Sequence, residues 1–425
     1  MGIVMSLELL FNASRKIEEF RGGPLGGCMD EFCDWLLKQG FSHITIRRHL
    51  ANVSHFKAFL GKRKRGEFQT ISAKDVNAFF TAYPAQARTK GALDPHVRRV
   101  RQSINRFVKF LQQSGRYDPQ HQRPVFVDIL QDYLQWMHDD RHASVSTLKS
   151  RRYYLSQFFT WLGPKITHKR LVELNAETIE QFFLSYGETA TSSSRQAMGT
   201  ALRTFLLFCF QKEVVPRPLT LAVPTLRSYR LATVPQALSD EQAQKVLDCV
   251  DRNTPVGRRD YAILQLLYTY GVRGGQVRHL QLSDIHWSKN QILFRALKRG
   301  KDSLLPLTED VGKSLLDYLK KARPKRVCSY VFLTSCAPYH RLDQSSTISK
   351  IVCSYIVKAR IDAPCKGSHA LRHCFATRMV QAGHPLKSVA DVLGHRRLST
   401  TFIYTKVDFN ALKQVALPWP QEVSK

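Results

Sequence analysis

Apolar residues in the first half of the chain recur at the spacing of amphipathic helices, for example at Leu50, Val53, Phe56, Phe59 and Leu60. The pattern occurs twice, because residues 32–61 resemble residues 133–163 at an offset of about 100 residues. VNAFFTAY and NRFVKFLQQ of the first copy have counterparts in IEQFFLSY and RTFLLFCFQ. This offset is typical of domains, so we predict two tandem all-α domains over residues 1–120 and 121–213. A chance match between amphipathic helices is the alternative.

The helical pattern gives way to other signals after residue 213. Four prolines between Val214 and Pro235 predict an extended linker over residues 214–235. Ser239 with acidic residues directly behind it predicts the start of a helix. Residues 290–307 predict a β-hairpin, because two apolar runs flank a turn at Arg299–Gly300. We therefore expect a third domain of mixed α and β structure over residues 236–425.

The chain is strongly basic along its whole length. Its 425 residues include 64 Lys and Arg against 34 Asp and Glu, which gives a formal net charge of +30. Basic residues spread in this way suit a long series of phosphate contacts better than a single targeting signal. Charge alone does not distinguish DNA from RNA or from an anionic membrane.

Two features that the sequence lacks bear on the compartment in which we expect the protein. No apolar run approaches the roughly 20 residues that span a bilayer. The nine cysteines include no CxxC pair, which disfavours both a zinc site and a disulfide framework. We therefore expect a cytoplasmic, nucleoid-associated protein without membrane contact.

Four separated segments of the third domain carry candidate chemistry. They are YTYGVRGGQVRHLQLSDI, with Arg273; the hairpin, with Lys298; SHALRHCFATRM, with His369 and Arg372; and LGHRRLSTTFIYTKV, with His395 and Tyr404. In this order and spacing they resemble the tyrosine recombinase family, which includes phage integrases, Xer-type recombinases and transposon-encoded relatives. The resemblance covers about residues 235–407, and the ending YTKVDFNALKQVALPWP is most similar to recombinases of mobile elements.

The resemblance implies a multidomain fold and an activity. The helical repeats look like SAM-like core-binding domains, of which the family usually has one, and the third domain looks like its α+β catalytic domain. The family breaks and rejoins DNA by attack of a tyrosine on phosphorus, which leaves a 3′-phosphotyrosine and a free 5′-hydroxyl. The chain is thus expected to be a transposase-like site-specific recombinase or integrase that needs no metal, ATP or other cofactor.

The resemblance also implies roles. Tyr404 matches the nucleophile. Arg273 and Arg372 match the phosphate clamp, because arginine stays charged and can hold two oxygens at once. Lys298 matches the general acid for the leaving 5′-oxygen, with Lys301 as a competitor.

Four histidines divide into two groups. His369 is expected to assist proton transfer or hold the phosphate, and His395 to hydrogen-bond a phosphate oxygen. We interpret His373 and His384 as structural.

The sequence departs from the family's pattern beside the first arginine. Gln276 stands where the family often has an acidic residue, which puts the rigidity of the clamp in doubt. Gly274 and Gly275 are expected to loosen the start of that helix.

Both helical repeats are expected to contact DNA through basic residues, with a solvated basic face as the alternative. The candidates are Arg47, Arg48, Arg98, Arg99, Arg101, Lys149, Arg151, Arg152 and Arg195, together with Lys301 of the hairpin.

The expected partner is double-stranded DNA with inverted repeats at the recombination site, bound by a homo-oligomer, a tetramer in the synaptic complex. Whether helper recombinases take part is left open. Apolar residues at Phe409, Leu412, Val415 and Ala416 predict a short C-terminal helix. This helix is expected to dock on a neighbouring protomer or to pack on its own domain.

Two other functions compete with this interpretation. A type IB topoisomerase shares the chemistry, but the tandem helical domains and the short tail argue against it. A catalytically idle DNA-binding architectural protein is disfavoured by the complete set of six residues. The DNA site and the direction of the reaction stay open.

Overall fold

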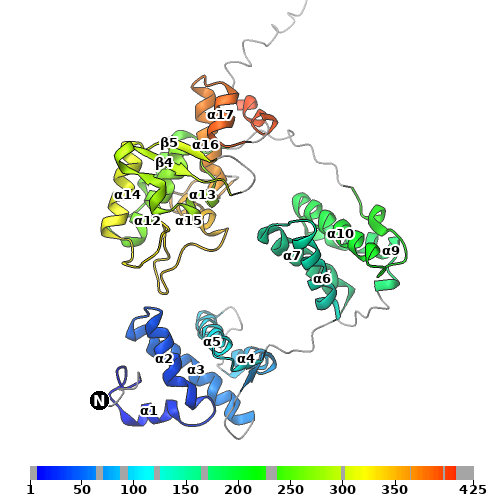
Figure 1. The fold of residues 1–425 in the computed structure, drawn as a ribbon, viewed down its shortest axis with the longest axis vertical. Helices are drawn as coiled ribbons and strands as arrows, with labels where there is room; N and C mark the ends of the chain where they lie inside the picture. Colours follow the sequence, from blue (N-terminus) through cyan, green and yellow to red (C-terminus); the bar gives the residue numbers. More distant parts are fainter. Residues whose placement is uncertain are drawn as a thin grey trace, which may run out of the picture. The chain divides into compact units, whose positions relative to one another are not determined.

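A computed structural model of the chain describes residues 7–63, 70–86, 94–118, 125–163, 171–225, 237–297, 302–363, 365–395 and 398–407 (Figure 1). The described residues divide into two compact units, one drawn from residues 1–33 and 47–229 and the other from residues 34–46 and 230–425. The elements are taken below in three groups, each by itself.

The N-terminal group is helical. Its helices pack through a core of aromatic side chains, and two short strands, β1 (Ile71–Ser72) and β2 (Tyr117–Asp118), pair in parallel. The helices are α1 (Ser14–Arg21), α2 (Met29–Lys38), α3 (His43–Arg63), α4 (Ala73–Gln86) and α5 (Pro95–Gln113).

A buried polar network joins α3 to α5 within this core. His49 Nδ1 lies 2.9 Å from Ser103 Oγ, Asn52 donates to the same hydroxyl at 2.9 Å, and Arg106 donates to His49 Nε2 at 2.7 Å. Burial, with the Arg106 and Arg48 charges, lowers the pKa of His49 to about 4. The imidazole therefore stays neutral at physiological pH and accepts the hydrogen bond from Arg106.

The middle group is also helical. It has one apolar core that includes Phe158, Phe182 and Phe205. The helices are α6 (Val125–Asp139), α7 (Val145–Leu162), α9 (Ala176–Thr189) and α10 (Ser192–Gln211), followed by the 3₁₀ turn η2 (Leu219–Ala222).

The two helical groups share local features that the predicted duplication anticipates. Ser42 accepts from the backbone N–H of Thr45 at the start of α3, and Ser144 accepts from that of Thr147 at the start of α7. In each group an aromatic pair in T-shaped contact joins the long helix to the next one. The pairs are Phe56–Phe79 and Phe158–Phe182, with ring centroids 5.2 and 4.9 Å apart.

The linker prediction is wrong for its first part. Val215 and Val223 are buried in the core of the middle group, and η2 packs on α9 and α10. Arg203 also donates to the carbonyls of Val223 and Pro224. This stretch packs on the helices instead of extending because the apolar side chains of Val215 and Val223 are buried in that core. Residues 226–235 lie outside the described residues.

The C-terminal group mixes α and β structure, as the pattern predicts. Its helices pack around a core centred on α12, and a three-stranded antiparallel sheet has the order β3-β4-β5. The elements are α11 (Asp240–Asp248), α12 (Pro255–Tyr270), α13 (Gly274–His279), β3 (Ile285–His286), β4 (Gln291–Phe294), β5 (Ser303–Pro306), α14 (Glu309–Lys321), α15 (Thr347–Lys358), α16 (Ser368–Gln381), α17 (Leu386–Val392), η5 (Leu398–Thr400) and η6 (Phe402–Val407).

Two local predictions in this group are confirmed. Ser239 caps α11 in a reciprocal capping box with Gln242. The hairpin forms with Ile292 opposite Leu305, although its expected turn at Arg299–Gly300 lies outside the described residues.

Candidate active site

Arg273 lies where α12 gives way to α13. Helix α12 ends at Gly271, whose φ of 57° belongs to the left-handed region that favours glycine. A Cβ there would lie 2.4 Å from the Phe375 ring, so both conformation and space require glycine. Arg273 then occupies the N-cap position of α13. From this position its side chain reaches the carbonyls that end α17.

Arg372 is buried on α16, with only 4% of its surface exposed. Its Nη1 donates to the Gly271 carbonyl at 2.7 Å, and its Nη2 donates to the Leu393 carbonyl at 2.7 Å. His369 lies one turn earlier, at the N-terminal end of the same helix. The guanidinium is thus fixed by backbone carbonyls from two other elements.

The Gly-His segment closes α17 and completes the clamp. Gly394 has a φ of 61°, and the backbone N–H of His395 returns to the Ala390 carbonyl at 2.8 Å, as in a Schellman ending. The Leu393 carbonyl accepts from Arg273 Nη1 at 3.3 Å as well as from Arg372, and the Gly394 carbonyl accepts from Arg273 Nη2 at 3.3 Å. The carbonyl end of a helix therefore holds both arginines together.

The charge of the two arginines is not neutralised locally. In the part of the chain that the structure describes, neither Arg273 nor Arg372 pairs with a carboxylate. Burial and the Arg273 charge lower the pKa of Arg372 to about 10, and burial lowers that of Arg273. Burial and both arginines also lower the pKa of His369. A buried cation with a second cation beside it, and no counter-ion for either, favours binding of an anion.

His395 bridges the clamp to the segment that carries the tyrosine. Its Nε2 lies 3.0 Å from Arg372 Nη2, and its Nδ1 lies 2.8 Å from the hydroxyl of the buried Thr401. Because arginine can only donate, Nε2 accepts and Nδ1 carries the proton toward Thr401. In this state His395 helps to hold Arg372.

Tyr404 lies in η6, with its ring in a small apolar cluster that includes Phe375 and Leu393. Only 2% of the residue is exposed. Its hydroxyl lies 2.8 Å from His373 Nδ1, and burial raises its pKa, which the Arg372 charge partly offsets. The tyrosine is therefore protonated and held beside the arginine clamp.

The structure brings together five of the six predicted catalytic residues, namely Arg273, His369, Arg372, His395 and Tyr404. Lys298 and its competitor Lys301 lie outside the described residues. His373, which the sequence led us to interpret as structural, contacts the Tyr404 hydroxyl, and its place next to Arg372 is the only sequence signal for this contact. His384 is exposed, and no contact of its side chain is described.

The residues beside Arg273 make specific contacts. The Gln276 side chain accepts from the Arg273 backbone N–H at 3.1 Å, so the amide supports the backbone of the clamp. At Gly274 the structure shows close packing. A Cβ at this position would lie 3.0 to 3.2 Å from Ser368 and Ile348, so glycine allows α13 to approach α15 and α16 closely.

The candidate DNA-binding residues of the helical groups are surface residues. Arg47 and Arg48 are exposed on α3, and Arg98, Arg99 and Arg101 are exposed on α5, where Arg101 stacks over the Phe80 ring. Lys149 and Arg152 are exposed on α7, whereas Arg151 and Arg195 are half-buried.

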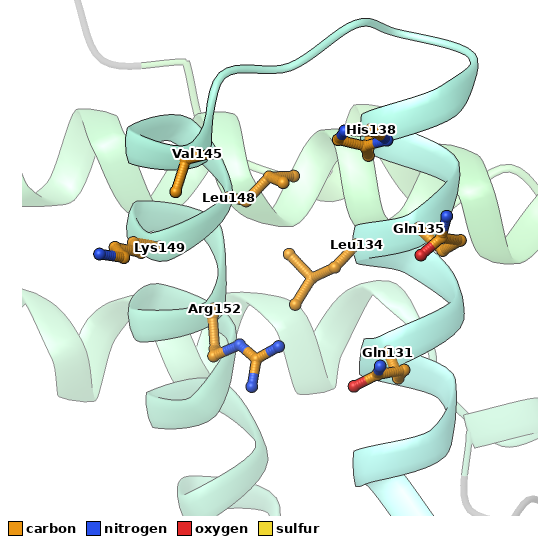
Figure 2. A pocket seen from close by; sticks show the side chains of 8 residues that line it. All are labelled: Gln131, Leu134, Gln135, His138, Val145, Leu148, Lys149 and Arg152. Atoms are coloured by element: carbon orange, nitrogen blue, oxygen red, sulfur yellow. The ribbon is translucent and has the colours of Figure 1, made fainter.

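A groove between α6 and α7 holds two of these residues at its edge. Figure 2 shows Leu134 and Leu148 facing each other across it, with Arg152 extending into the same space. The groove has a volume of about 560 Å³ and is lined by Gln131, Leu134, Gln135, His138, Val145, Leu148, Lys149 and Arg152. Its polar walls carry hydrogen-bond donors and positive charge above an apolar floor.

Two features are absent from the described residues. No group of three or more His, Cys, Asp and Glu side chains is placed to hold a metal ion within this part of the chain. Likewise, no helix in the described ranges has the length and apolar character to cross a membrane.

Comparison with known proteins identifies the family. Residues 236–411 match the family model described as "Phage integrase family". Tyrosine recombinase XerD of Vibrio vulnificus is 31% identical over 293 residues, which cover 67% of this chain and 93% of that protein. The chain belongs to the tyrosine recombinase family. Members of this family are site-specific recombinases that cleave and rejoin DNA, so the resemblance drawn from the four sequence segments is confirmed.

The similarity extends beyond the C-terminal group. A Sinorhizobium fredii protein named as integrase/recombinase y4rA is 29% identical to the recombinase over 423 residues, which cover 98% of this chain and 100% of that protein. The crystal structure of a lambda integrase tetramer bound to a Holliday junction matches with a TM-score of 0.53 at 14% identity, covering 77% of this chain and 93% of that one. At this identity the match shows the fold alone.

Proposed function

We propose that the recombinase cleaves DNA by attack of Tyr404 on a phosphodiester, which leaves a 3′-phosphotyrosine and a free 5′-hydroxyl, and rejoins strands by the reverse reaction. The observation that carries the proposal is the buried Arg372 guanidinium with the more exposed Arg273 beside it, placed next to a buried tyrosine hydroxyl; neither arginine has a carboxylate partner among the described residues. A phosphodiester supplies both the anion that the clamp needs and the electrophile for the tyrosine.

Arg273 and Arg372 would hold the non-bridging oxygens. Their hydrogen bonds to the Leu393 carbonyl fix them relative to each other before DNA arrives, so little reorganisation accompanies the reaction. His369 lies at the N-terminal end of α16, where the helix dipole also favours negative charge. These groups together would stabilise the charge that develops on the phosphate in the transition state.

His395 would exchange one partner for another. It now accepts a hydrogen bond from Arg372, and a bound phosphate oxygen would compete for that guanidinium. Once released, His395 could donate to the phosphate after gaining a proton or changing its tautomer. Lys298 stays our proposed general acid for the leaving oxygen, with Lys301 as its competitor.

The recombinase is proposed to bind double-stranded DNA with inverted repeats as a homo-oligomer, a tetramer in the synaptic complex, and to serve a mobile element. A net charge of +30 and the exposed basic residues of α3, α5 and α7 support DNA binding. The matched lambda integrase structure is itself a tetramer on a Holliday junction. The predicted C-terminal helix, with Phe409, Leu412, Val415 and Ala416, lies outside the described residues.

The groove between α6 and α7 is proposed to face the DNA. Its amide and basic side chains can donate to base edges and phosphates, and Lys149 and Arg152 both lie along it.

The proposal is tested by incubating the recombinase with a nicked half-site in the presence of a metal chelator, followed by a denaturing gel. The half-site is taken from inverted repeats in the DNA that flanks the gene. A covalent protein–DNA adduct is expected for the parental protein. Tyr404→Phe should form no adduct and should keep nearly parental affinity for DNA, because only one hydroxyl is removed. An adduct formed by Tyr404→Phe, or none formed by the parental protein, would refute the proposal.

A further inference from the structure

We propose that His373 is the general base that takes the hydroxyl proton of Tyr404 as the tyrosine attacks. The inference deepens the proposed function and rests on it. Its basis is the contact between His373 Nδ1 and the Tyr404 hydroxyl at 2.8 Å, with ring centroids 5.7 Å apart. A candidate base must lie within hydrogen-bond reach of the proton that it removes, and this nitrogen already does.

Helix α16 positions both residues of this contact. His373 follows Arg372 on α16, so the residue that binds the phosphate and the residue that meets the nucleophile share one turn of helix. Tyr404 packs with Phe375 and Ala376 of the same helix, and η6 lies against α16. The hydroxyl is thus held near the clamp and against the imidazole.

The protonation states fit the role. Burial, with the His369 and Arg372 charges, lowers the pKa of His373, so the imidazole is neutral at physiological pH. Burial raises the pKa of Tyr404, so the hydroxyl keeps its proton. A protonated nucleophile beside a neutral imidazole requires proton transfer as it attacks.

No carboxylate of the neighbouring elements faces His373 within the described part of the domain. Asp240 of α11 instead pairs with Arg378 further along α16, and Tyr268 of α12 stacks on that same arginine. Lys387 and Asp391 of α17 are exposed.

On the side of α15, a hydroxyl is the group that meets α16. Ser349 contacts Ser368 at the start of α16. The groups that set the protonation of His373 are therefore His369 and Arg372 on its own helix and Tyr404 on η6.

The step balances without a further reactant. The bond from the Tyr404 oxygen to phosphorus forms as the bond from phosphorus to the 5′-oxygen breaks. The tyrosine proton moves to His373 Nδ1, while Nε2 keeps its own proton and an imidazolium results. The leaving 5′-oxygen takes its proton from the general acid, for which we propose Lys298. In rejoining, the 5′-hydroxyl attacks phosphorus and His373 returns the proton to the departing tyrosine oxygen.

The first test compares His373→Asn with His373→Leu in single-turnover cleavage of the nicked half-site, from about pH 5 to about pH 9. Asparagine can keep a hydrogen bond to the hydroxyl but cannot take a proton, so it separates basicity from positioning. The parental rate should rise with pH and level off as His373 loses its proton. Both variants should be slower on the order of 10²-fold or more, with rates that continue to rise with pH.

A modified substrate separates the base from the acid. A half-site with sulfur in place of the bridging 5′-oxygen has a leaving group that needs no proton. This substrate should restore cleavage by Lys298→Ala but not by His373→Asn. Rescue of His373→Asn by the sulfur substrate would assign His373 to the leaving group and overturn the inference. A parental rate and pH profile for His373→Asn would overturn it as well.

A measurement on the parental protein tests the role of His373 even if the His373 variants fail to fold. Nitrogen NMR of labelled histidines distinguishes an accepting Nδ1 from one that carries the proton, and the His373 signal is identified by its shift in Tyr404→Phe. We expect an accepting Nδ1 at neutral pH, and a protonated Nδ1 would refute the role. If the parental protein forms an adduct that needs Tyr404 but not His373, this inference alone fails. If no adduct forms at all, the proposed function fails.

Discussion

Replacement of the buried Arg372 by methionine should impair function far more than it impairs stability. Arg372 is 4% exposed and lacks a carboxylate partner among the described residues, and its pKa is lowered to about 10. Keeping that charge buried costs about 3 kcal/mol relative to water. Methionine removes this cost and fills most of the same volume.

The losses in Arg372→Met offset part of this gain. The Gly271 carbonyl loses its donor, and an unsatisfied acceptor costs about 1 to 3 kcal/mol, whereas the Leu393 carbonyl keeps the hydrogen bond from Arg273. The free energy of opening α16 should therefore change by no more than about 2 kcal/mol. This change is smaller than the roughly 3 to 5 kcal/mol that is typically lost when one partner of a buried ion pair is removed, because Arg372 has no carboxylate partner among the described residues. Cleavage should fall on the order of 10²-fold or more, because a donor to the transition state is lost.

The assay is native-state hydrogen exchange of α16, with and without sulfate, because local exchange does not require the whole chain to unfold in one step. Sulfate at about 100 times its Kd should stabilise the parental α16 by about 2 to 3 kcal/mol. It should stabilise Arg372→Met much less, since half of the clamp is gone.

The matched control is Arg378→Met on the same helix. Arg378 pairs with Asp240 at 2.8 Å and stacks on Tyr268, and its side chain is 34% exposed. Its replacement should cost about 1 kcal/mol or less and should leave both the sulfate effect and cleavage unchanged. The reasoning is refuted if Arg372→Met loses about 4 kcal/mol or more, or if sulfate stabilises it as much as the parental protein.

Three further predictions follow from the same geometry. Gln276→Ala should slow single-turnover cleavage about fivefold, because it removes the oxygen that accepts from the Arg273 backbone N–H, whereas Gln276→Glu should cleave at near the parental rate. If Gln276→Ala cleaves as fast as Gln276→Glu, this hydrogen bond has no role in cleavage. Gly271→Ala should destabilise the C-terminal group by about 2 kcal/mol or more in thermal unfolding, since its Cβ would lie 2.4 Å from Phe375 at a positive φ; a parental melting temperature would contradict this. Alanine at the three exposed arginines of α5 should lower the salt dependence of DNA affinity by about 0.9 per lost phosphate contact, and an unchanged slope would indicate a solvated face.

The sequence by itself determined the features that depend on neighbouring residues. The cap at Ser239 and the hairpin that pairs Ile292 with Leu305 each follow from one short stretch of sequence. Local rules suffice there because the hydrogen bonds involved close within one short segment of the chain. The catalytic candidates could also be named from the sequence, because four segments in their order and spacing resemble the tyrosine recombinase family.

Tertiary structure decided what those residues do to one another. The Leu393 carbonyl accepts from Arg273, 120 positions earlier in the sequence, and from Arg372, 21 positions earlier; His373 contacts Tyr404 across 31 positions. Residues 214–225 pack instead of extending because the core of the middle group offers Val215 and Val223 an apolar surface. Local patterns predict which backbone a segment prefers. They carry no information on which distant carbonyl or imidazole it will face, because packing of the whole core determines those contacts.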